Sequence, residues 1–421
     1  MNRLQYVRRR GSMYVAVLGS AMVITVTGLS ALMLARSERS SAAGTADLST
    51  ARFYAQSAIE LGQHRIRQDS NWRQTSTSGA WESNRPIGTG KYTLEGIDPV
   101  DGNLGNSASD SVLLRGTGFE GLSRYKLEVT MNAKSRALTC LQVAMHTGLG
   151  LIFNSATVQS NLMTISSNGT ALAISSLVYP NVEVVTTWSG SNYQTLPKSG
   201  ITPRTMPDAT VFDYYTTNGT TINYASIPKV SGKTTIEKCV LSPSINNYGS
   251  TNPNGIYVIN CGLGALVIRN CRIVGTLVII TSGAFSIENS VIWDPAVTNY
   301  PSLLVNGSAA FKYTNTALSE SSTNVNFNPS GPPAVPYQGA SDTDKVDNYP
   351  SVINGLVYVS GSATTATYVT INGVLVVGTT LTAQNTLSLS YQSTFYDNPP
   401  PGFGSAAEME ISPGTWKQLV D

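Results

Sequence analysis

The chain has 421 residues, 41% of them hydrophobic and 12% charged, and its formal net charge is +2. So small a charge, without a basic stripe beyond the first residues, argues against nucleic-acid binding, and the recurring Val, Ile and Leu runs exclude a disordered chain. Gly, Ser, Thr and Asn replace much of the usual Glu and Lys, which favours β-structure with many turns over a helical bundle.

The N-terminus has the pattern of a membrane anchor. Residues 1–11 carry four arginines, and residues 12–35 (SMYVAVLGSAMVITVTGLSALMLA) carry no charge. A helix of that length, at about 1.5 Å per residue, crosses a hydrocarbon core roughly 30 Å thick. The arginine excess before the segment places the N-terminus in the cytoplasm. We therefore expect a single-pass protein of the inner (cytoplasmic) membrane, its C-terminal part in the periplasm or at the cell surface. The anchor residues include Met13, Val17, Ile24 and Leu32.

Two other targeting signals fit this segment less well. A secretory signal peptide has an apolar core of roughly 7–15 residues followed by a small-residue cleavage site, whereas this run is longer and no convincing site follows it. A twin-arginine signal needs more than a bare Arg-Arg pair.

Residues 8–11, Arg-Arg-Arg-Gly directly before the apolar helix, resemble the leader of type IV prepilins. The resemblance implies that a prepilin peptidase cleaves between Gly11 and Ser12. Two positions depart from the major pilins: Ser12 replaces Phe or Met, and Ala16 stands where most pilins have Glu. A missing glutamate is also a feature of the minor pseudopilin at the tip of type II secretion pseudopili. A carboxylate inside the membrane is costly unless it is paired. Ala16 therefore implies a minor or tip subunit.

Residues 47–67 continue the helical pattern with one apolar stripe at 3- and 4-residue spacings. The stripe consists of Leu48, Ala51, Tyr54, Ala55, Ala58, Ile59, Gly62 and Ile66. This text resembles the PilX-like minor pilins and the tip pseudopilin, in which one helix is both anchor and spine of the globular domain. We expect the helix to continue over residues 36–75, and the resemblance implies other pilin or pseudopilin subunits and the membrane as partners. The competing interpretation is an ordinary amphipathic helix on a membrane-anchored domain.

The next segment, 76–138, predicts a small antiparallel sheet. Residues 91–98, 111–118 and 124–131 alternate apolar and polar side chains, and three such strands can cover the apolar stripe of the helix. Asp98, Asp101, Asn103 and Asp110 form a weak calcium candidate, because hard oxygen ligands cluster in one loop. Their spacing differs from an EF-hand, and turn formation also explains them.

Residues 139–396 read as short β-runs separated by Gly, Asn and Ser. Four tetrads echo one another, beginning at Ile236, Val258, Ile268 and Ile287. We expect a parallel β-helix with Val, Ile and Leu ladders inside and a corner stack of Asn260, Asn270 and Asn289. Residues 312–350 form an excursion from the coils, and residues 397–421 a surface tail. A β-sandwich is the alternative.

The β-rich part holds few residues that could take part in catalysis or bind a ligand. Glu237, Glu288 and Asp294 occur about once per coil and do not recur at a stacking distance, which argues against a glycosidase or lyase. Ser231-Gly-Lys-Thr-Thr lacks the first glycine of a phosphate-binding loop, so no nucleotide is expected. Cys261 and Cys271 could pair in an oxidising compartment, although small half-buried strand residues explain them as well.

These patterns predict a non-enzymatic chain without cofactor or metal. Its expected role is that of a minor pilin or pseudopilin of a type IV pilus or type II secretion filament, with a large extracytoplasmic β-rich head for tip or surface interaction. The alternative is a membrane-anchored surface adhesin or polysaccharide-acting β-helix protein.

Overall fold

The computed structural model describes residues 12–69, 71–107, 110–134, 136–160, 163–405 and 408–420. The predicted leader, residues 1–11, lies outside this part. The chain forms two compact units: unit 1 contains Met1–Lys134 and Ala407–Asp421, and unit 2 contains Ser135–Ala406. Unit 2 is therefore an insertion into unit 1.

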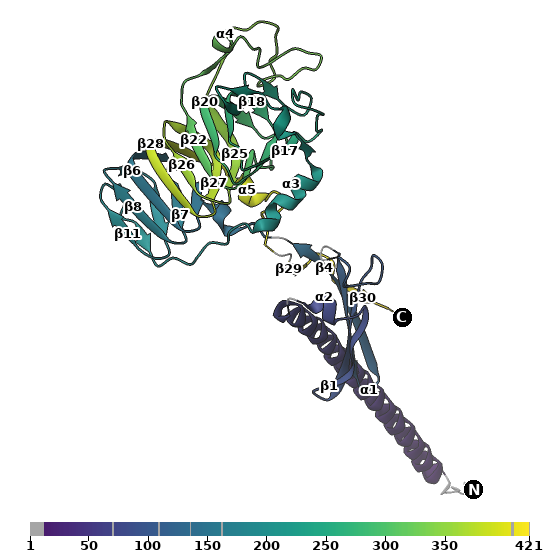
Figure 1. The fold of residues 1–421 in the computed structure, drawn as a ribbon. Coiled ribbons are helices and arrows are strands. Elements are labelled where there is room, and N and C mark those ends of the chain that lie inside the picture. The colour runs from purple at the N-terminus through teal and green to yellow at the C-terminus, as the bar shows by residue number, and fades with distance from the viewer. Residues whose placement is uncertain are drawn as a thin grey trace, which may run out of the picture. The chain divides into compact units, whose positions relative to one another are not determined.

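A single helix dominates unit 1 (Figure 1). Helix α1, Ser12–Gln68, has 57 residues, which corresponds to roughly 86 Å at 1.5 Å per residue. The expected apolar N-terminal helix and its continuation are thus one unbroken element. It ends at Gln68 rather than at residue 75, because a second short helix, α2 (Trp72–Thr75), follows separately.

The sheet of unit 1 is antiparallel, as expected, but it has six strands in place of three. The strands are β1 (Gly79–Ile87), β2 (Gly90–Ile97), β3 (Val112–Glu120), β4 (Ser123–Lys134), β29 (Glu408–Ile411) and β30 (Lys417–Leu419). The surface tail predicted for residues 397–421 is wrong, since β29 and β30 both pair with β4. Their pairing satisfies an edge that the 12-residue β4 would otherwise expose.

Helix α1 packs closely against β3 because both elements present small residues. Ala51 and Ala55 are fully buried. A Cβ atom added to Gly118 would lie 2.0 Å from the Ala51 carbonyl oxygen, and one added to Gly116 would lie 2.1 Å from the Ala55 carbonyl oxygen. Only glycine permits this approach of two backbones. The predicted stripe is confirmed from Ala51 onward, whereas Leu48 remains 45% exposed.

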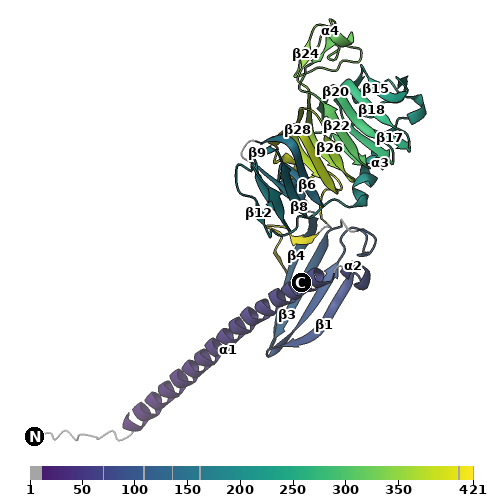
Figure 2. The same ribbon diagram turned by 60° about the vertical axis from the view of Figure 1, so that its left-hand side comes forward.

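Most strands of unit 2 pair in parallel with strands of the next coil, visible in Figure 2 as stacked arrows, whereas β14 (Lys229–Val230) pairs antiparallel with β15 (Lys233–Glu237). Parallel pairing excludes the β-sandwich alternative, whose sheets are antiparallel. We call residues 145–313 and 352–391 the coil stack. Its strands are β5 (Met145–Thr147), β6 (Gly150–Ser160), β7 (Thr164–Ser167), β8 (Thr170–Ile174), β9 (Leu177–Val178), β10 (Asn181–Val184), β11 (Trp188–Gly190), β12 (Lys198–Ser199), β13 (Thr220–Thr221), β14 (Lys229–Val230), β15 (Lys233–Glu237), β16 (Val240–Leu241), β17 (Ile256–Gly262), β18 (Leu266–Val274), β19 (Thr276–Thr281), β20 (Phe285–Asp294), β21 (Leu303–Asn306), β22 (Ala309–Tyr313), β25 (Val352–Val359), β26 (Ala363–Thr365), β27 (Val369–Val377) and β28 (Thr380–Tyr391).

The order of the coils in space differs from their order in the chain. The first coil stacks on the last one: Met145 of β5 lies opposite Leu375 of β27, and Leu151 of β6 opposite Leu381 of β28. The chain therefore enters the middle of the stack and runs outward to β12. It then crosses to the other end and returns coil by coil to β28.

The crossing segment and the chain's return cover one outer face of the stack. The segment contains η2 (Ala209–Phe212) and α3 (Asp213–Asn218), and the return contains α5 (Thr394–Asp397). Tyr215 of α3 is fully buried, and the apolar cluster around it includes Val258, Val278 and Tyr358 on the outer face of the strands. A strand buried on both faces reads as a continuous apolar run. This explains why the sequence GIYVIN is apolar almost throughout, although alternate side chains point in opposite directions.

One corner of the coils uses left-handed backbone. The corner residues with positive φ are Lys238, Asn270, Asn289, Asn385, Ser155 and Ser175. Asn tolerates this conformation better than most residues do. The echo at Asn270 and Asn289 is therefore a real coil repeat, and Ile236, Ile268 and Ile287 do align across neighbouring coils.

The predicted stack of Asn260 with Asn270 and Asn289 is wrong. Val258, two residues before Asn260, aligns with Thr221 and Val278, so its tetrad belongs to a different side of the coil. The described residues contain an amide ladder elsewhere: Asn372 Nδ2 donates to Asn354 Oδ1 over 3.0 Å, and Asn354 Nδ2 donates to Asp294 Oδ1 over 2.7 Å.

The excursion from the coils is present, beginning after Tyr313, where β22 ends. We call residues 314–351 the excursion. It contains β23 (Leu318–Ser319), α4 (Glu320–Thr323) and β24 (Asn348–Tyr349). Phe327 and Tyr349 form a small core with Ile292 of the stack. The buried Arg272 of β18 donates to the carbonyl oxygens of Phe327, Val335 and Pro336 at 2.6–2.8 Å and so fastens the excursion to the coil.

Candidate assembly helix and neighbouring sites

The N-terminal half of α1 presents apolar side chains to its surroundings. The predicted anchor residues Met13, Val17, Ile24 and Leu32 are all between 62% and 78% exposed. This helix is long and apolar enough to cross a membrane, and none of its most apolar window is buried within the described residues. Burying each such side chain gains roughly 1.5–3 kcal/mol, so apolar surroundings stabilise the segment. A membrane-anchoring helix is the consistent interpretation.

Hydroxyl groups within this segment bond back to the helix. Ser20 Oγ donates to the Val17 carbonyl over 3.0 Å, and Thr25 Oγ1 to the Ala21 carbonyl over 2.7 Å. Thr27 does the same toward Val23 over 2.8 Å. In a hydrocarbon environment every donor must be satisfied internally, so these hydroxyl groups are compatible with the bilayer interior.

Ala16 lies on the exposed part of α1 and carries no charge, as the sequence states. Gly11 lies outside the described residues, and nothing is described of the Ser12 side chain. The cleavage between them therefore stays a prediction.

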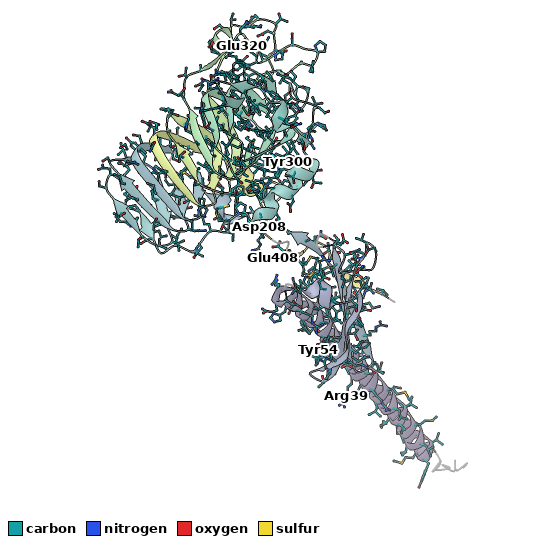
Figure 3. The ribbon with its side chains drawn as sticks, viewed as in Figure 1. Arg39, Tyr54, Asp208, Tyr300, Glu320 and Glu408 are labelled. Atoms are coloured by element: carbon teal, nitrogen blue, oxygen red, sulfur yellow. The ribbon has the colours of Figure 1, made fainter. Side chains whose placement is uncertain are left out.

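Beyond the membrane segment, α1 keeps an apolar surface on the side that does not face the sheet. Phe53 is 63% exposed and Leu61 40%. Tyr54, in contrast, contacts the β1–β2 turn, and its hydroxyl accepts from the Thr89 amide over 3.3 Å. Figure 3 marks Tyr54 beside the sheet and Arg39 on the part of α1 that extends past it. The described residues thus leave Phe53 and Leu61 largely uncovered.

A buried ion-pair network joins the chain's last strand to the sheet. The Glu128 carboxylate of β4 is 3% exposed and accepts from Arg115 Nη2 and from Lys417 Nζ, each over 2.7 Å. Burial alone would raise the pKa of Glu128, but the hydrogen bonds from Lys417 and Arg115 outweigh it and lower the pKa. Lys417 belongs to β30, so the network anchors the C-terminal strand.

The weak calcium candidate is partly assembled in the structure. Carboxylate oxygens of Asp98, Asp101 and Asp110 lie within 4.8 Å of one another. The side-chain oxygen of Asn103 accepts from the Gly105 amide over 3.1 Å. Burial lowers the pKa of the Arg73 guanidinium, and the nearby carboxylates of Asp110 and Asp98 offset this effect only in part. This group therefore already has a cation nearby.

The isolated acids of the coil stack make local contacts. Glu237 Oε2 accepts from Arg269 over 2.6 Å, Glu288 Oε1 from Ser286 over 2.9 Å, and Asp294 from Asn354. Each carboxylate supports the packing of its own or a neighbouring coil.

The four cysteines are buried free thiols. Of the two possibilities that the sequence left open for Cys261 and Cys271, pairing is not the one observed. Cys239 lies beside Cys271, with the sulfur atoms 3.6 Å apart, because both follow the left-handed corner of adjacent coils. Cys261 belongs to the other side of its coil, in β17.

A further acidic group, which the sequence analysis did not single out, lies in the excursion. Oxygens of Glu320, Asp342 and Asp344 lie within 4.8 Å of one another. The text Asp342-Thr-Asp344-Lys-Val-Asp347 was a usable signal, but Glu320 lies far from it in the sequence.

Comparison with known proteins finds no matching family model and no matching curated protein. Among solved structures, the competence-associated pilin ComZ from Thermus thermophilus aligns with a TM-score of 0.30 and 9% identity, covering 89% of this chain and 98% of that one. An ice binding protein from an Antarctic Biological Consortium aligns with a TM-score of 0.21 and 10% identity, covering 61% of this chain and 91% of that one. At these scores neither likeness assigns a fold or a function.

Proposed function

We propose that this chain is a non-enzymatic minor pilin- or pseudopilin-like subunit of a type IV pilus or type II secretion filament. The observation that carries the proposal is α1, one 57-residue helix with an unpartnered apolar first half. Its second half is the buried spine of an antiparallel sheet. A helix of this kind can pass from a bilayer into a bundle of like helices without changing its fold.

In the proposed mechanism, a peptidase removes residues 1–11 on the cytoplasmic side and α1 then packs with neighbouring helices. Ala16 offers no carboxylate to pair with a neighbour's N-terminal amine, so the subunit suits a tip or minor position. Unit 2, which we interpret as a parallel β-helix, forms the extracytoplasmic head.

The connection to the head supports a load-bearing role. Lys134 of β4 and Glu408 of β29 lie opposite each other in the sheet, so both links to unit 2 leave from neighbouring antiparallel strands. Within unit 2 the pairing continues, as the Leu138 amide donates to the Phe403 carbonyl over 3.0 Å. Force on the head is thereby shared between two hydrogen-bonded segments rather than carried by one linker.

Leader processing tests the proposal first. Mass spectrometry of the membrane-extracted chain should show a mature N-terminus at Ser12, and Gly11→Lys should abolish this cleavage. Gly19→Ala is a matched control, because a methyl group there meets nothing within 4 Å. An intact Met1 in the presence of active peptidase would refute the pilin-like assignment.

Subunit contact tests the second step. A photo-crosslinking residue at the exposed Phe53 should yield adducts with pilin or pseudopilin subunits, whereas one at the exposed Lys229 of the head should not. A cleaved chain that forms no such adduct would instead favour a membrane-anchored adhesin. Release of oligosaccharides by the purified chain would favour the polysaccharide-acting alternative.

A further inference from the structure

The excursion gathers four carboxylates from two separated segments. Glu320 begins α4, and Asp342, Asp344 and Asp347 precede β24. Oxygens of the first three lie within 4.8 Å of one another. The Asp347 carboxylate lies next to this group, because Asn328 Nδ2 donates both to Asp342 Oδ2 and to Asp347 Oδ2, over 3.2 Å each. Figure 3 marks Glu320 in this part of the chain.

Glu320 is fully buried, and its hydrogen bonds define how the excursion folds. Besides the Asp347 amide, its carboxylate accepts from the Phe327 amide and from the Tyr349 hydroxyl, the latter over 2.9 Å. A buried carboxylate is normally paired with a cation or bound to a metal. Among the described residues, no salt bridge reaches any of the four carboxylates.

Nearby basic side chains are committed to other partners. Lys345 Nζ donates to the side-chain oxygen of Asn324 over 3.3 Å, and the Nη groups of Arg272 bind backbone carbonyls. The cluster therefore concentrates negative charge.

Asn328 provides an independent indication of a ligand. Its side chain is almost completely buried, at 3% exposure, and its Nδ2 donates to Asp342 and Asp347, over 3.2 Å each, so the amide lies between two carboxylates. The other end of this amide, Oδ1, is buried without a hydrogen-bond partner. Leaving such an oxygen unsatisfied costs about 1–3 kcal/mol.

A cation resolves both the unpaired charges and the unsatisfied amide. The oxygen and nitrogen of an Asn amide exchange places by a half-turn of the group. Such a turn would aim Oδ1 at the carboxylates. Without a metal ion, the oxygen atoms would then repel one another. With a metal ion held between them, Oδ1 would become a further ligand.

We propose that Glu320, Asp342, Asp344, Asp347 and Asn328 form a calcium site that fastens the excursion. All ligands are oxygen atoms, which suits calcium and not zinc or copper. Calcium accepts six to eight oxygen ligands in flexible geometry, whereas magnesium demands a near-ideal octahedron and usually retains several waters. Five side chains from two irregular segments match the former. The site does not depend on the filament role proposed above.

The site can be tested on the detergent-solubilised full-length chain. Terbium luminescence excited through tyrosine should appear and be displaced by calcium, because the Tyr349 hydroxyl bonds Glu320 directly. We expect a calcium dissociation constant on the order of 10⁻⁴–10⁻³ M, the range of extracellular modules. Hydrogen exchange of amides in 320–349 should slow about 11-fold at ten times that concentration.

Asp344→Asn is the preferred variant, since Asp344 is exposed and its described hydrogen bond is a local one to the Val346 amide over 3.1 Å. It should weaken calcium binding at least about tenfold while leaving the exchange of coil-stack amides unchanged. Asp342→Asn provides a second test if the first variant folds poorly. The double substitution Asp98→Asn with Asp101→Asn is the matched control and should leave the terbium signal intact.

Three results would overturn the proposal. The first is the absence of any calcium-dependent luminescence or exchange protection at about 10 mM calcium, a concentration well above the expected range. The second is loss of calcium binding in the Asp98/Asp101 control but not in the Asp344 variant. The third is equal exchange protection by magnesium at the same concentration.

Discussion

Gly118→Ala tests whether the close approach of α1 to β3 holds unit 1 together. An added Cβ would lie 2.0 Å from the Ala51 carbonyl oxygen and 2.8 Å from the Ala55 amide nitrogen. Both contacts are with helix backbone, so no side-chain rotation relieves them and the helix must move away from the sheet. This movement would also loosen Ile59, which packs in the same core.

The expected cost follows from these contacts. Overpacking a well-filled core costs about 1–3 kcal/mol, and contact with rigid backbone places Gly118→Ala toward the upper end. Since every 1.4 kcal/mol changes an equilibrium constant tenfold, local opening of unit 1 should increase by a factor of about 5 to 150.

Hydrogen exchange with mass spectrometry resolves the two units separately. In Gly118→Ala, amides of residues 51–66 should exchange faster by that factor, while amides of the coil stack, which has its own core, should not change. Gly44→Ala is the matched control, because a methyl group there meets nothing within 4 Å and alanine favours a helix interior by about 1 kcal/mol. Unchanged exchange in Gly118→Ala, or equal acceleration in the control, would refute the reasoning.

Three further predictions concern buried titratable groups. Burial lowers the pKa of His146 to about 3, so only the unfolded chain binds its proton as the pH falls below about 6.5. The free energy of unfolding should therefore decrease from that pH toward 3, and His146→Gln should flatten the decrease in urea titrations. Hydrogen bonds from Lys417 and an arginine lower the pKa of Glu128 below 4.5. Its contribution is present above that pH and lost in more acidic solution, so calorimetry should show Glu128→Gln destabilised at pH 7 and matching the wild type in strong acid. Burial raises the pKa of Cys140 to about 12 and of Cys261 to about 11. Ellman's reagent should therefore label these thiols only after denaturation, and rapid labelling of the native chain would contradict their burial.

The elements of unit 1 were predictable where local periodicity determines them. The uncharged run and the alternating strands are local patterns, and the structure confirms the apolar helix and its antiparallel sheet. Leu48 shows the limit of this reasoning, because a stripe on a helix does not tell where the covering sheet ends. The C-terminal strands were not predictable at all, since Glu408 pairs with Lys134 across an insertion that no local pattern spans.

The sequence allowed us to predict that the coil stack consists of repeated β-strands, but not the order in which its coils stack. An echo in the sequence marks residues with the same local environment, but each coil has several sides. Val258 and Ile268 both begin an apolar tetrad, yet they align with Val278 and Ile287 on different sides. The pairing of Met145 with Leu375 was hidden for the same reason, since any buried apolar strand fits any other.

The same argument explains why the acidic group of the excursion escaped detection. Asp342 and Asp344 form a short acidic motif that, taken alone, is typical of a solvated loop. What distinguishes it is the fully buried Glu320, which a different segment contributes and which the Tyr349 hydroxyl holds in place. Burial of a carboxylate is a property of the packed excursion, not of its sequence. A reader of the sequence could have counted the charges, but only the fold shows that the described chain provides no basic partner for them, and that shortage is the reason to expect a metal ion there.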